Sequence, residues 1–187
     1  MAKILNEEDR KNLLQLARSV IASELSREDI PETGNLSPAV REKQGCFVTL
    51  HKKGMLRGCI GTIEPVKALA DAVKENALHS AFRDSRFPPL KAEELPETDI
   101  EISVLTKPEI LSYRDGEDLI TKLKPGIHGV ILSKDGYRST FLPQVWEQLP
   151  DPEIFLSHLC RKGGMGGDCW KKGDVEVKVY EVFHFSE

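Results

Sequence analysis

The chain has 187 residues, of which 40% are hydrophobic and 30% charged, so it can bury the core of one domain or of a domain with an inserted subdomain. Its 26 basic and 30 acidic side chains give a formal net charge of −4, which disfavours non-specific binding to nucleic acid. No apolar run is long enough to span a membrane, and the N-terminal residues lack the features of a secretory signal. We therefore expect a cytoplasmic protein without a membrane partner.

The N-terminal part predicts one helix and one hairpin. Asn6 can cap a helix, and the acids at positions 7–9 suit the positive end of its dipole before apolar residues recur at helical spacing as far as Ile21. Residues 46–51 and 55–62 are two strand-like stretches around a short turn, whose glycine tolerates a positive φ. These two stretches are expected to pair antiparallel.

Residues 65–81 predict an amphipathic helix packed on that hairpin. Pro65 suits a first helical position, and apolar side chains follow at helical spacing through Ala81. The segment Phe87-Pro88-Pro89 ends the helix, because proline cannot continue it. Residues 99–105 then alternate apolar and polar side chains, as a half-buried strand does.

The C-terminal part predicts a second hairpin, a helix and a final strand. Residues 128–133 and 137–142 flank Asp135-Gly136, a pair that favours a tight turn. Asp151-Pro152 suits the cap and first turn of a helix, and residues 175–185 resemble a strand. Strands that pair by hairpins, with helices between them, predict an α+β fold with a mostly antiparallel sheet flanked by helices.

Four strings of residues occur in a fixed order: Leu56-Arg-Gly-Cys-Ile-Gly-Thr62, His79-Ser-Ala-Phe-Arg-Asp-Ser-Arg-Phe-Pro-Pro89, Gly129-Val130 with Tyr137-Arg-Ser-Thr-Phe-Leu-Pro143, and Arg161-Lys-Gly-Gly164. Together they resemble the AMMECR-one domain family, from about the first helix to the final strand. The resemblance implies a larger subdomain that contains both chain ends, residues 1–112 and 173–187, and a smaller inserted α+β subdomain, residues 113–172. It also implies that residues 56–61 face the junction between the two.

Bacterial and archaeal proteins of that family are labelled AmmeMemoRadiSam system protein A and are grouped with a Memo-like protein and a radical S-adenosylmethionine enzyme. The resemblance therefore implies these two proteins as partners. The family's biochemical activity is not established. The resemblance accordingly implies neither a reaction nor a cofactor, and it leaves open whether the chain is an enzyme.

Cys59, in the second strand of the first hairpin, is the first candidate for chemistry. In an extended strand Arg57 and Cys59 lie on one face, and a neighbouring cation favours the nucleophilic thiolate over the thiol. Gly58 and Gly61 let a ligand or another backbone approach closely. The alternative is that Cys59 is a small core residue and that the two glycines admit the helix packed above them.

A second group of candidates lies where the helix at residues 65–81 ends. A helical wheel places His79, Arg83 and Arg86 at neighbouring positions, and their side chains suit a small anionic ligand that carries a carboxylate or phosphate. The alternative is that Asp84 and Arg86 form a structural pair that clamps the following Pro-Pro turn to the sheet. His128, near the second hairpin, is assigned to the same cleft.

The four cysteines, Cys46, Cys59, Cys160 and Cys169, are too sparse for a disulfide scaffold and are expected to be free thiols. His158 and Cys160 offer soft metal ligands near Cys169, but their spacing on a helix points them apart. No metal site is therefore predicted.

These observations predict a ligand-binding or active-site cleft at the subdomain junction, lined by residues 56–61. The alternative is a non-enzymatic adaptor that presents a cleft or an edge strand to protein partners. Nucleic-acid binding is a third option, which the acidic charge disfavours. The predicted catalytic residues are Cys59, Arg57 and His79, and the predicted ligand-binding residues are Gly58, Gly61, Asp84, Arg86 and His128.

Overall fold

The computed structural model describes residues 5–29 and 37–187, and the chain divides into two compact units. One unit comprises Met1–Lys107 and Phe183–Glu187, and the other comprises Pro108–Val182. The second unit extends beyond the segment predicted at residues 113–172 on both sides, because strands that flank this segment join its sheet. Each unit has its own sheet and its own hydrophobic core.

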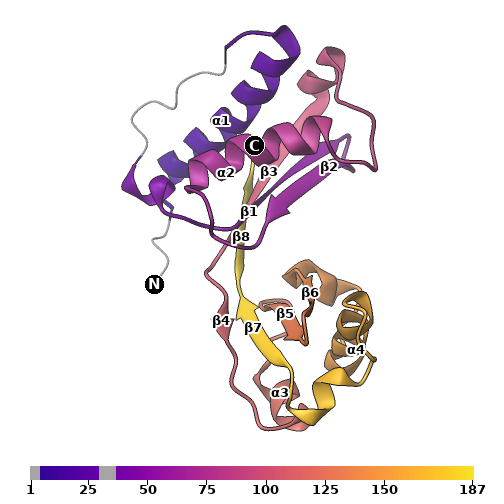
Figure 1. The fold of residues 1–187 in the computed structure, drawn as a ribbon. Helices are drawn as coiled ribbons and strands as arrows, with labels where there is room; N and C mark the ends of the chain where they lie inside the picture. The colour runs from indigo at the N-terminus through magenta and orange to yellow at the C-terminus, as the bar shows by residue number, and fades with distance from the viewer. Residues whose placement is uncertain (1–4, 30–36) are drawn as a thin grey trace. The chain divides into compact units, whose positions relative to one another are not determined.

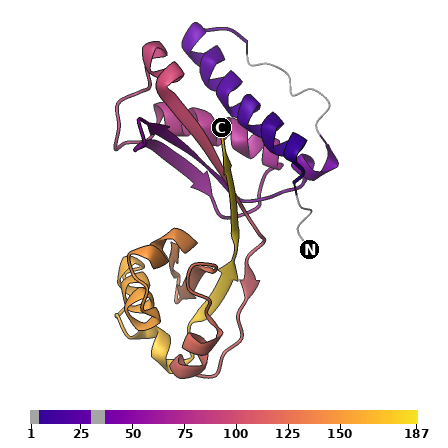
Figure 2. The ribbon, with the colours of Figure 1, turned by 180° about the vertical axis from the view of Figure 1, so that it is seen from behind.

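The first unit is built from α1 (Glu7–Ser26), η1 (Pro38–Arg41), β1 (Cys46–Lys52), β2 (Met55–Thr62), α2 (Leu69–Phe82), η2 (Ala92–Glu97), β3 (Thr98–Leu105) and β8 (Val182–Ser186), where η marks a 3₁₀ helix. Its sheet has the order β2-β1-β3-β8, so β2 is an edge strand. Strand β1 pairs antiparallel with both neighbours, which confirms the predicted hairpin. Helices α1 and α2 run beside one another and share one core with the sheet (Figures 1 and 2).

Only one face of this sheet carries the core. Cross-strand partners such as Leu50 and Ile100 are fully buried on the face toward the helices. The intervening residues lie on the other face, where Thr49 is in register with Cys59 of β2 and with Glu101 of β3. Successive side chains of β2 therefore alternate between the face toward α2 and the face away from it.

Helix α1 begins at the predicted residue. Asn6 accepts a hydrogen bond from the backbone N–H of Asp9 at 2.8 Å, and the Asp9 carboxylate accepts one from the N–H of Asn6 at 3.3 Å. This reciprocal capping box satisfies backbone donors that the first helical turn leaves unpaired. The helix ends at Ser26, before Arg27 adopts the left-handed conformation with φ of 58°.

Helix α2 begins at Leu69 and not at Pro65, so the predicted start was wrong. Ala68 forms an isolated antiparallel bridge with Lys43, and the N–H of Leu69 donates to the carbonyl of Glu42 at 2.9 Å. Pairing with this earlier segment holds Lys67 and Ala68 outside the helix. Helical periodicity in the sequence does not reveal such a long-range backbone contact.

The second unit is built from β4 (Glu109–Ile110), α3 (Gly116–Lys122), β5 (Gly129–Lys134), β6 (Tyr137–Phe141), η3 (Pro143–Glu147), α4 (Pro152–Lys162), η4 (Cys169–Lys172) and β7 (Glu176–Tyr180). Its sheet has the order β4-β7-β5-β6 with antiparallel pairing. The core packs around α4, where the ring of Phe155 stacks on Trp146 with centroids 3.6 Å apart. The second hairpin, the helix capped by Asp151 and the α+β class are confirmed.

The single strand predicted at residues 175–185 is in fact two strands. β7 pairs with β4 and β5 in the second unit, whereas β8 lies next to β3 in the sheet of the first unit. The apolar residues at odd-numbered positions are interrupted at Tyr180-Glu181-Val182, where the chain leaves one sheet and joins the other. This break in the alternation was a signal that the prediction overlooked.

Two cysteines that were predicted to be free form a disulfide. Cys160, near the end of α4, is bonded to Cys169, at the start of η4, and their Cα atoms are 6.3 Å apart. The segment between them turns back after α4, where Gly164 adopts a φ of +76° that glycine tolerates. This return brings the two thiols together, whereas Cys46 and Cys59 remain free.

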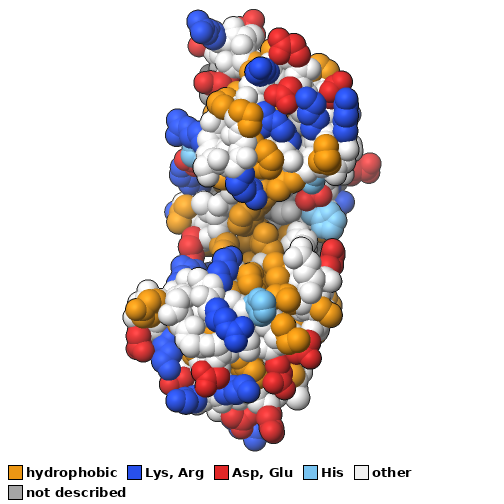
Figure 3. Space-filling view, turned by 90° about the vertical axis from the view of Figure 1, so that its right-hand side faces the viewer, with side chains coloured by type: hydrophobic (Ala, Val, Ile, Leu, Met, Phe, Trp, Pro, Cys, Tyr) orange, Lys and Arg blue, Asp and Glu red, His pale blue; other side chains and the backbone are white. Residues whose placement is uncertain are grey.

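The surface shown in Figure 3 carries Lys and Arg side chains interspersed with Asp and Glu over both units, without a large field of one sign. Among residues 5–29 and 37–187, no helix combines the length and the apolar character that a membrane crossing requires.

Candidate functional site

The two glycines of the 56–61 string are sites of close packing. A Cβ atom on Gly58 would lie 2.1 Å from the carbonyl oxygen of Ser80, so the backbone of α2 lies directly on this position. A Cβ atom on Gly61 would lie 2.3 Å from the ring of Phe47. The close approach at Gly58 is the helix packing that the alternative interpretation expects, and it leaves no room for a ligand between β2 and α2.

Arg57 is buried and holds η2 against β2. Its Nε and Nη2 donate to the two carboxylate oxygens of Glu94 at 3.2 and 3.0 Å, and Nη2 also donates to the carbonyl of Pro88 at 2.9 Å. This paired hydrogen bond lowers the pKa of Glu94 to about 2, with a further contribution from Lys52. The guanidinium therefore serves a structural ion pair, although Arg57 and Cys59 share a face of the strand.

The Cys59 thiol is half-buried and has a fixed neighbour across the hairpin. The hydroxyl of Thr49 donates to its Sγ at 3.3 Å, in the register that pairs these two residues. The backbone of Cys59 points outward from the edge strand, where its N–H donates to Asp84 at 2.9 Å and its carbonyl accepts from Nη2 of Arg86 at 3.2 Å. Side chains thus occupy edge positions that a neighbouring strand would otherwise occupy.

Asp84 and Arg86 form the structural pair that the alternative interpretation describes. The Arg86 guanidinium donates to both carboxylate oxygens of Asp84, at 2.9 and 2.6 Å, and the backbone N–H of Arg86 adds a third bond at 3.1 Å. The hydrogen bonds from the guanidinium hold the pKa of Asp84 well below its usual range. The same bond raises the pKa of Arg86, with a smaller contribution from Cys59, whose carbonyl accepts from this guanidinium.

His79 and Arg83 do not join this cluster: the helical wheel was right that these two are neighbours, but wrong to place Arg86 beside them. Helix α2 ends at Phe82, and the backbone changes direction at Arg83, which carries Arg86 toward Cys59 and leaves Arg83 behind. The imidazole Nε2 of His79 lies 3.3 Å from Nη1 of Arg83, and both side chains line a pocket beside α1. The structure therefore separates the two arginines that the sequence placed together.

His128 belongs to the second unit and has structural contacts there. Its Nδ1 accepts a hydrogen bond from the backbone N–H of Lys124 at 3.2 Å, and its carbonyl accepts one from the Trp146 indole at 2.7 Å. Burial of the ring lowers its pKa, with a smaller effect from Lys124. The residue therefore supports the turn that precedes β5.

Comparison with known proteins identifies the family of this chain. A family model described as AMMECR1 matches residues 14–185. The chain belongs to the AMMECR1 family. Relatives in the family include a protein of Methanothermobacter thermautotrophicus, 40% identical over 186 residues that cover 96% of each chain, and one of Methanosarcina barkeri, 39% identical over 189 residues that cover 98% of this chain and 93% of the relative.

A solved archaeal structure has the same fold. The crystal structure of the uncharacterized protein PH0010 from Pyrococcus horikoshii matches with a TM-score of 0.86 and 36% identity, covering 98% of this chain and 93% of that chain. The recognition of the family from the four strings and the α+β fold class are both confirmed.

Thr49 and Glu94 surround the predicted residues but were not themselves predicted. Thr49 is a common type of residue in a strand, and its partner depends on the hairpin register, which shifts between Leu50 and His51. Glu94 lies in η2, far from Arg57 in sequence, and no local pattern marks it as the acid that pairs with Arg57. Both are long-range contacts that only the folded chain reveals.

Proposed function

We propose that residues 56–61 of this AMMECR1-family protein form part of a ligand-binding or active site, in which Cys59 is the reactive group and Arg86 holds an anionic group of the ligand. The observation that supports this most directly is the position of Arg86. Its guanidinium contacts Cys59, yet 55% of the side chain remains exposed. A ligand could therefore reach the cation and the sulfur together.

Asp84 gives the site its rigidity. Because the carboxylate is buried and accepts from both Arg86 and the backbone of Cys59, the guanidinium is oriented before any ligand arrives. A preorganised donor loses little conformational entropy on binding. The carboxylate also offsets the charge of Arg86, so we expect weak binding of a simple anion and stronger binding of a ligand with a second contact.

Alkylation of the native protein by iodoacetamide tests the reactive cysteine without any knowledge of the substrate. Cys46 is fully buried, and burial raises its pKa to about 11, while Cys160 and Cys169 are joined in a disulfide. We expect mass spectrometry to find a single label, on Cys59. If the native chain takes up no label, while the unfolded and unreduced chain takes up two, Cys59 is a packing residue and the proposal fails.

The role of Arg86 is tested by its replacement with glutamine. The exposed cation next to Cys59 should attract an anionic reagent, so Arg86→Gln should slow alkylation by iodoacetate about threefold or more. Arg83→Gln is the matched control, because that arginine follows the same helix but lies beside His79 instead of Cys59. Equal rates in the two variants would assign Arg86 to the structural clamp alone.

A non-enzymatic adaptor is the second candidate function, and the exposed tip of the β1–β2 hairpin favours it. Met55 is 70% exposed and Leu56 is 41% exposed, next to one another on the edge strand. Exposed apolar side chains on an edge strand are a common basis for binding another protein. On this proposal the partners are the Memo-like protein and the radical S-adenosylmethionine enzyme that the family resemblance implies.

Titration calorimetry with each purified partner from the same organism tests the adaptor. We expect Met55→Lys to weaken binding at least about tenfold, since it places a charge in the apolar contact. Val66→Lys, a change at another exposed apolar residue of the first unit, should have no effect. Absence of heat with either wild-type partner would count against the adaptor while leaving the reactive cysteine untouched.

A further inference from the structure

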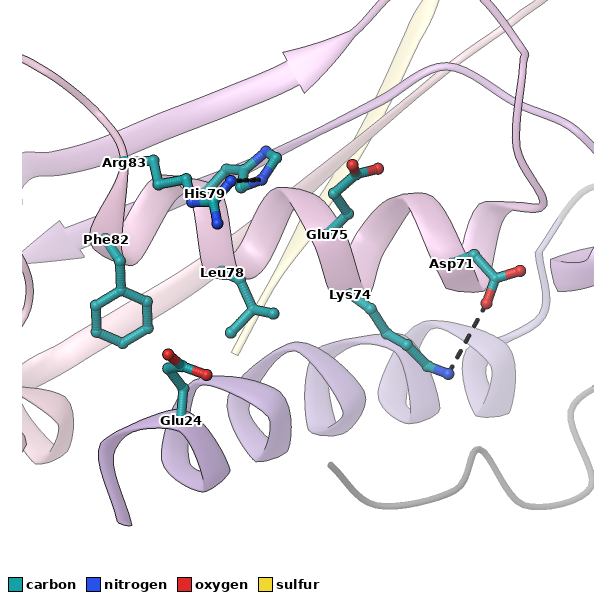
Figure 4. A pocket seen from close by; sticks show the side chains of 8 residues that line it. All are labelled: Glu24, Asp71, Lys74, Glu75, Leu78, His79, Phe82 and Arg83. Atoms are coloured by element: carbon teal, nitrogen blue, oxygen red, sulfur yellow. Dashed lines mark hydrogen bonds and ion pairs between the residues drawn. The ribbon is translucent and has the colours of Figure 1, made fainter. Parts of the chain in front are cut away.

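A pocket separate from the Cys59 cluster lies in the first unit, between α1 and α2. It has a volume of about 320 Å³, which is near the lower end of the range for small-ligand sites. Figure 4 shows its lining side chains, which come from α2, from Arg83 just beyond it and from Glu24 of α1. None of the residues that contact Cys59 contributes to it.

Most charges in this pocket are already compensated. Lys74 lies 3.8 Å from Asp71, and Glu75 is paired with Lys67. Within residues 5–29 and 37–187, Arg83 and Glu24 form no ion pair with each other or with another side chain. The pKa of Glu75 is lowered mainly by Lys67 and also by the charges of His79 and Arg83, so this acid lies near the cation without forming an ion pair with it. Arg83 and Glu24 therefore remain as the cation and the anion that a ligand can pair with.

A histidine side chain lies next to Arg83, the available cation. The Nη1 atom of Arg83 lies 3.3 Å from Nε2 of His79, one helical turn earlier. Because a guanidinium has only donors, Nε2 of His79 accepts this hydrogen bond and orients Arg83, and Nδ1 of the ring remains to donate to a bound carboxylate. In Figure 4 these two side chains lie together on one side of α2, and Glu24 lies on the side toward α1.

An apolar surface lies between the two charges. Leu78 and Phe82 are one helical turn apart, and both are only partly buried, with one side packed against the core of the first unit. Their remaining surface lines the pocket. Figure 4 shows Glu24 directed toward this apolar pair.

We propose that this pocket binds a small zwitterion whose carboxylate and ammonium groups are separated by an apolar chain. The carboxylate contacts Arg83 and His79, the chain covers Leu78 and Phe82, and the ammonium contacts Glu24. This proposal rests on two charged groups without ion-pair partners, Arg83 and Glu24, and on the apolar surface that lies between them. Ligands with one charge only should bind more weakly, because each leaves one of the two charged groups without a partner.

Titration of the isotope-labelled full chain with 6-aminohexanoate, followed by amide chemical shifts, tests the proposal. We expect saturable shifts confined to the C-terminal halves of α1 and α2. Hexanoate and hexylammonium, which each lack one charge, should bind roughly threefold to tenfold more weakly. Linear shifts without saturation, or shifts spread over the chain, would overturn the proposal.

Two charge-removing variants assign the ends of the ligand. Arg83→Gln should weaken 6-aminohexanoate and hexanoate but not hexylammonium, and Glu24→Gln should weaken 6-aminohexanoate and hexylammonium but not hexanoate. Arg41→Gln is the control, an exposed arginine before β1 that lies outside the pocket. All three positions are exposed, so the spectra of the variants should show an intact fold. Identical affinities in all three variants would show that the pocket does not recognise the charges of the probe.

Discussion

The edge of β2 in the first unit and the segment after α4 in the second unit both bring distant side chains together, but by different forces. At the β2 edge, Arg57 forms a hydrogen-bonded ion pair with Glu94, and the local pair of Asp84 and Arg86 is hydrogen-bonded to the backbone of Cys59. In the other segment, a covalent bond joins α4 to η4. An ion pair depends on the protonation of its acid, whereas a disulfide depends on the redox state of its surroundings.

This difference means that the two units should respond to different perturbations. A fold held by buried acids is sensitive to the loss of one partner, since the remaining charge is then buried without compensation. A segment held by a disulfide gains stability mainly because the bond restricts the unfolded chain. Both tryptophans of the protein, Trp146 and Trp170, lie in the second unit, so their fluorescence reports on that unit alone.

The largest expected effect is the loss of Arg57. Replacement by alanine leaves Glu94 next to Lys52 only and removes the link from β2 to η2, so Arg57→Ala should lower the free energy of unfolding by about 3–4 kcal/mol. Circular dichroism in a urea titration measures the change. The matched control is Lys67→Ala, which breaks an exposed pair with Glu75 and should cost less than about 1 kcal/mol. Equal losses in the two variants would show that the buried pair has no special weight.

A somewhat smaller effect is expected when the disulfide is removed. The bond closes a loop between residues nine positions apart, and loop entropy predicts that Cys160→Ala with Cys169→Ser lowers the stability of the second unit by about 2–3 kcal/mol. Urea unfolding followed by tryptophan fluorescence measures it, and a reducing agent should mimic the variant in the wild-type protein. The unfolding midpoint of the first unit, measured by an extrinsic probe on Cys59, should stay unchanged. No response of the fluorescence transition to reductant would contradict the bond's contribution.

The contrast between the two segments also shows how far sequence alone reaches. Local signals succeeded where the cause is local: the cap at Asn6, the turn that includes Gly54 and the cap at Asp151 all mark element ends correctly. The disulfide was missed, because counting cysteines gives no information about the return of the chain after α4 that brings Cys160 and Cys169 into contact.

At the candidate site, too, local features were predicted correctly and long-range contacts were not. The strand pattern correctly placed Arg57 and Cys59 on one face, but it could not show that Arg57 would pair with Glu94. Simple counting from the hairpin turn would place Thr49 opposite Gly58. The irregularity in the register after Leu50 shifts the pairing by one residue and puts Thr49 opposite Cys59. Contacts that depend on a bulge or on the end of a helix therefore could not be predicted from the sequence.

The smallest expected effect distinguishes the two units by pH. Burial lowers the pKa of His128 below its ordinary value of 6.5, so the unfolded chain binds a proton more readily than the folded one. The stabilisation from the neutral ring is complete above about pH 6.5 and is lost as the pH falls through the folded pKa. Glu94 also loses its stabilising effect as the pH falls, but at lower pH, between its ordinary pKa of 4.5 and the folded value of about 2.

Acidification from pH 7.0 to pH 5.5 should therefore destabilise the second unit while leaving the first almost unchanged. Urea titrations by tryptophan fluorescence and by circular dichroism at the two pH values separate the units. His128→Asn should flatten the dependence in this interval, because the amide oxygen can still accept from the N–H of Lys124 but does not titrate. His158→Asn, at an exposed position of α4, should retain the wild-type dependence. If both variants lose stability equally on acidification, a group other than His128 controls the second unit, and the assigned contrast in pH response is wrong.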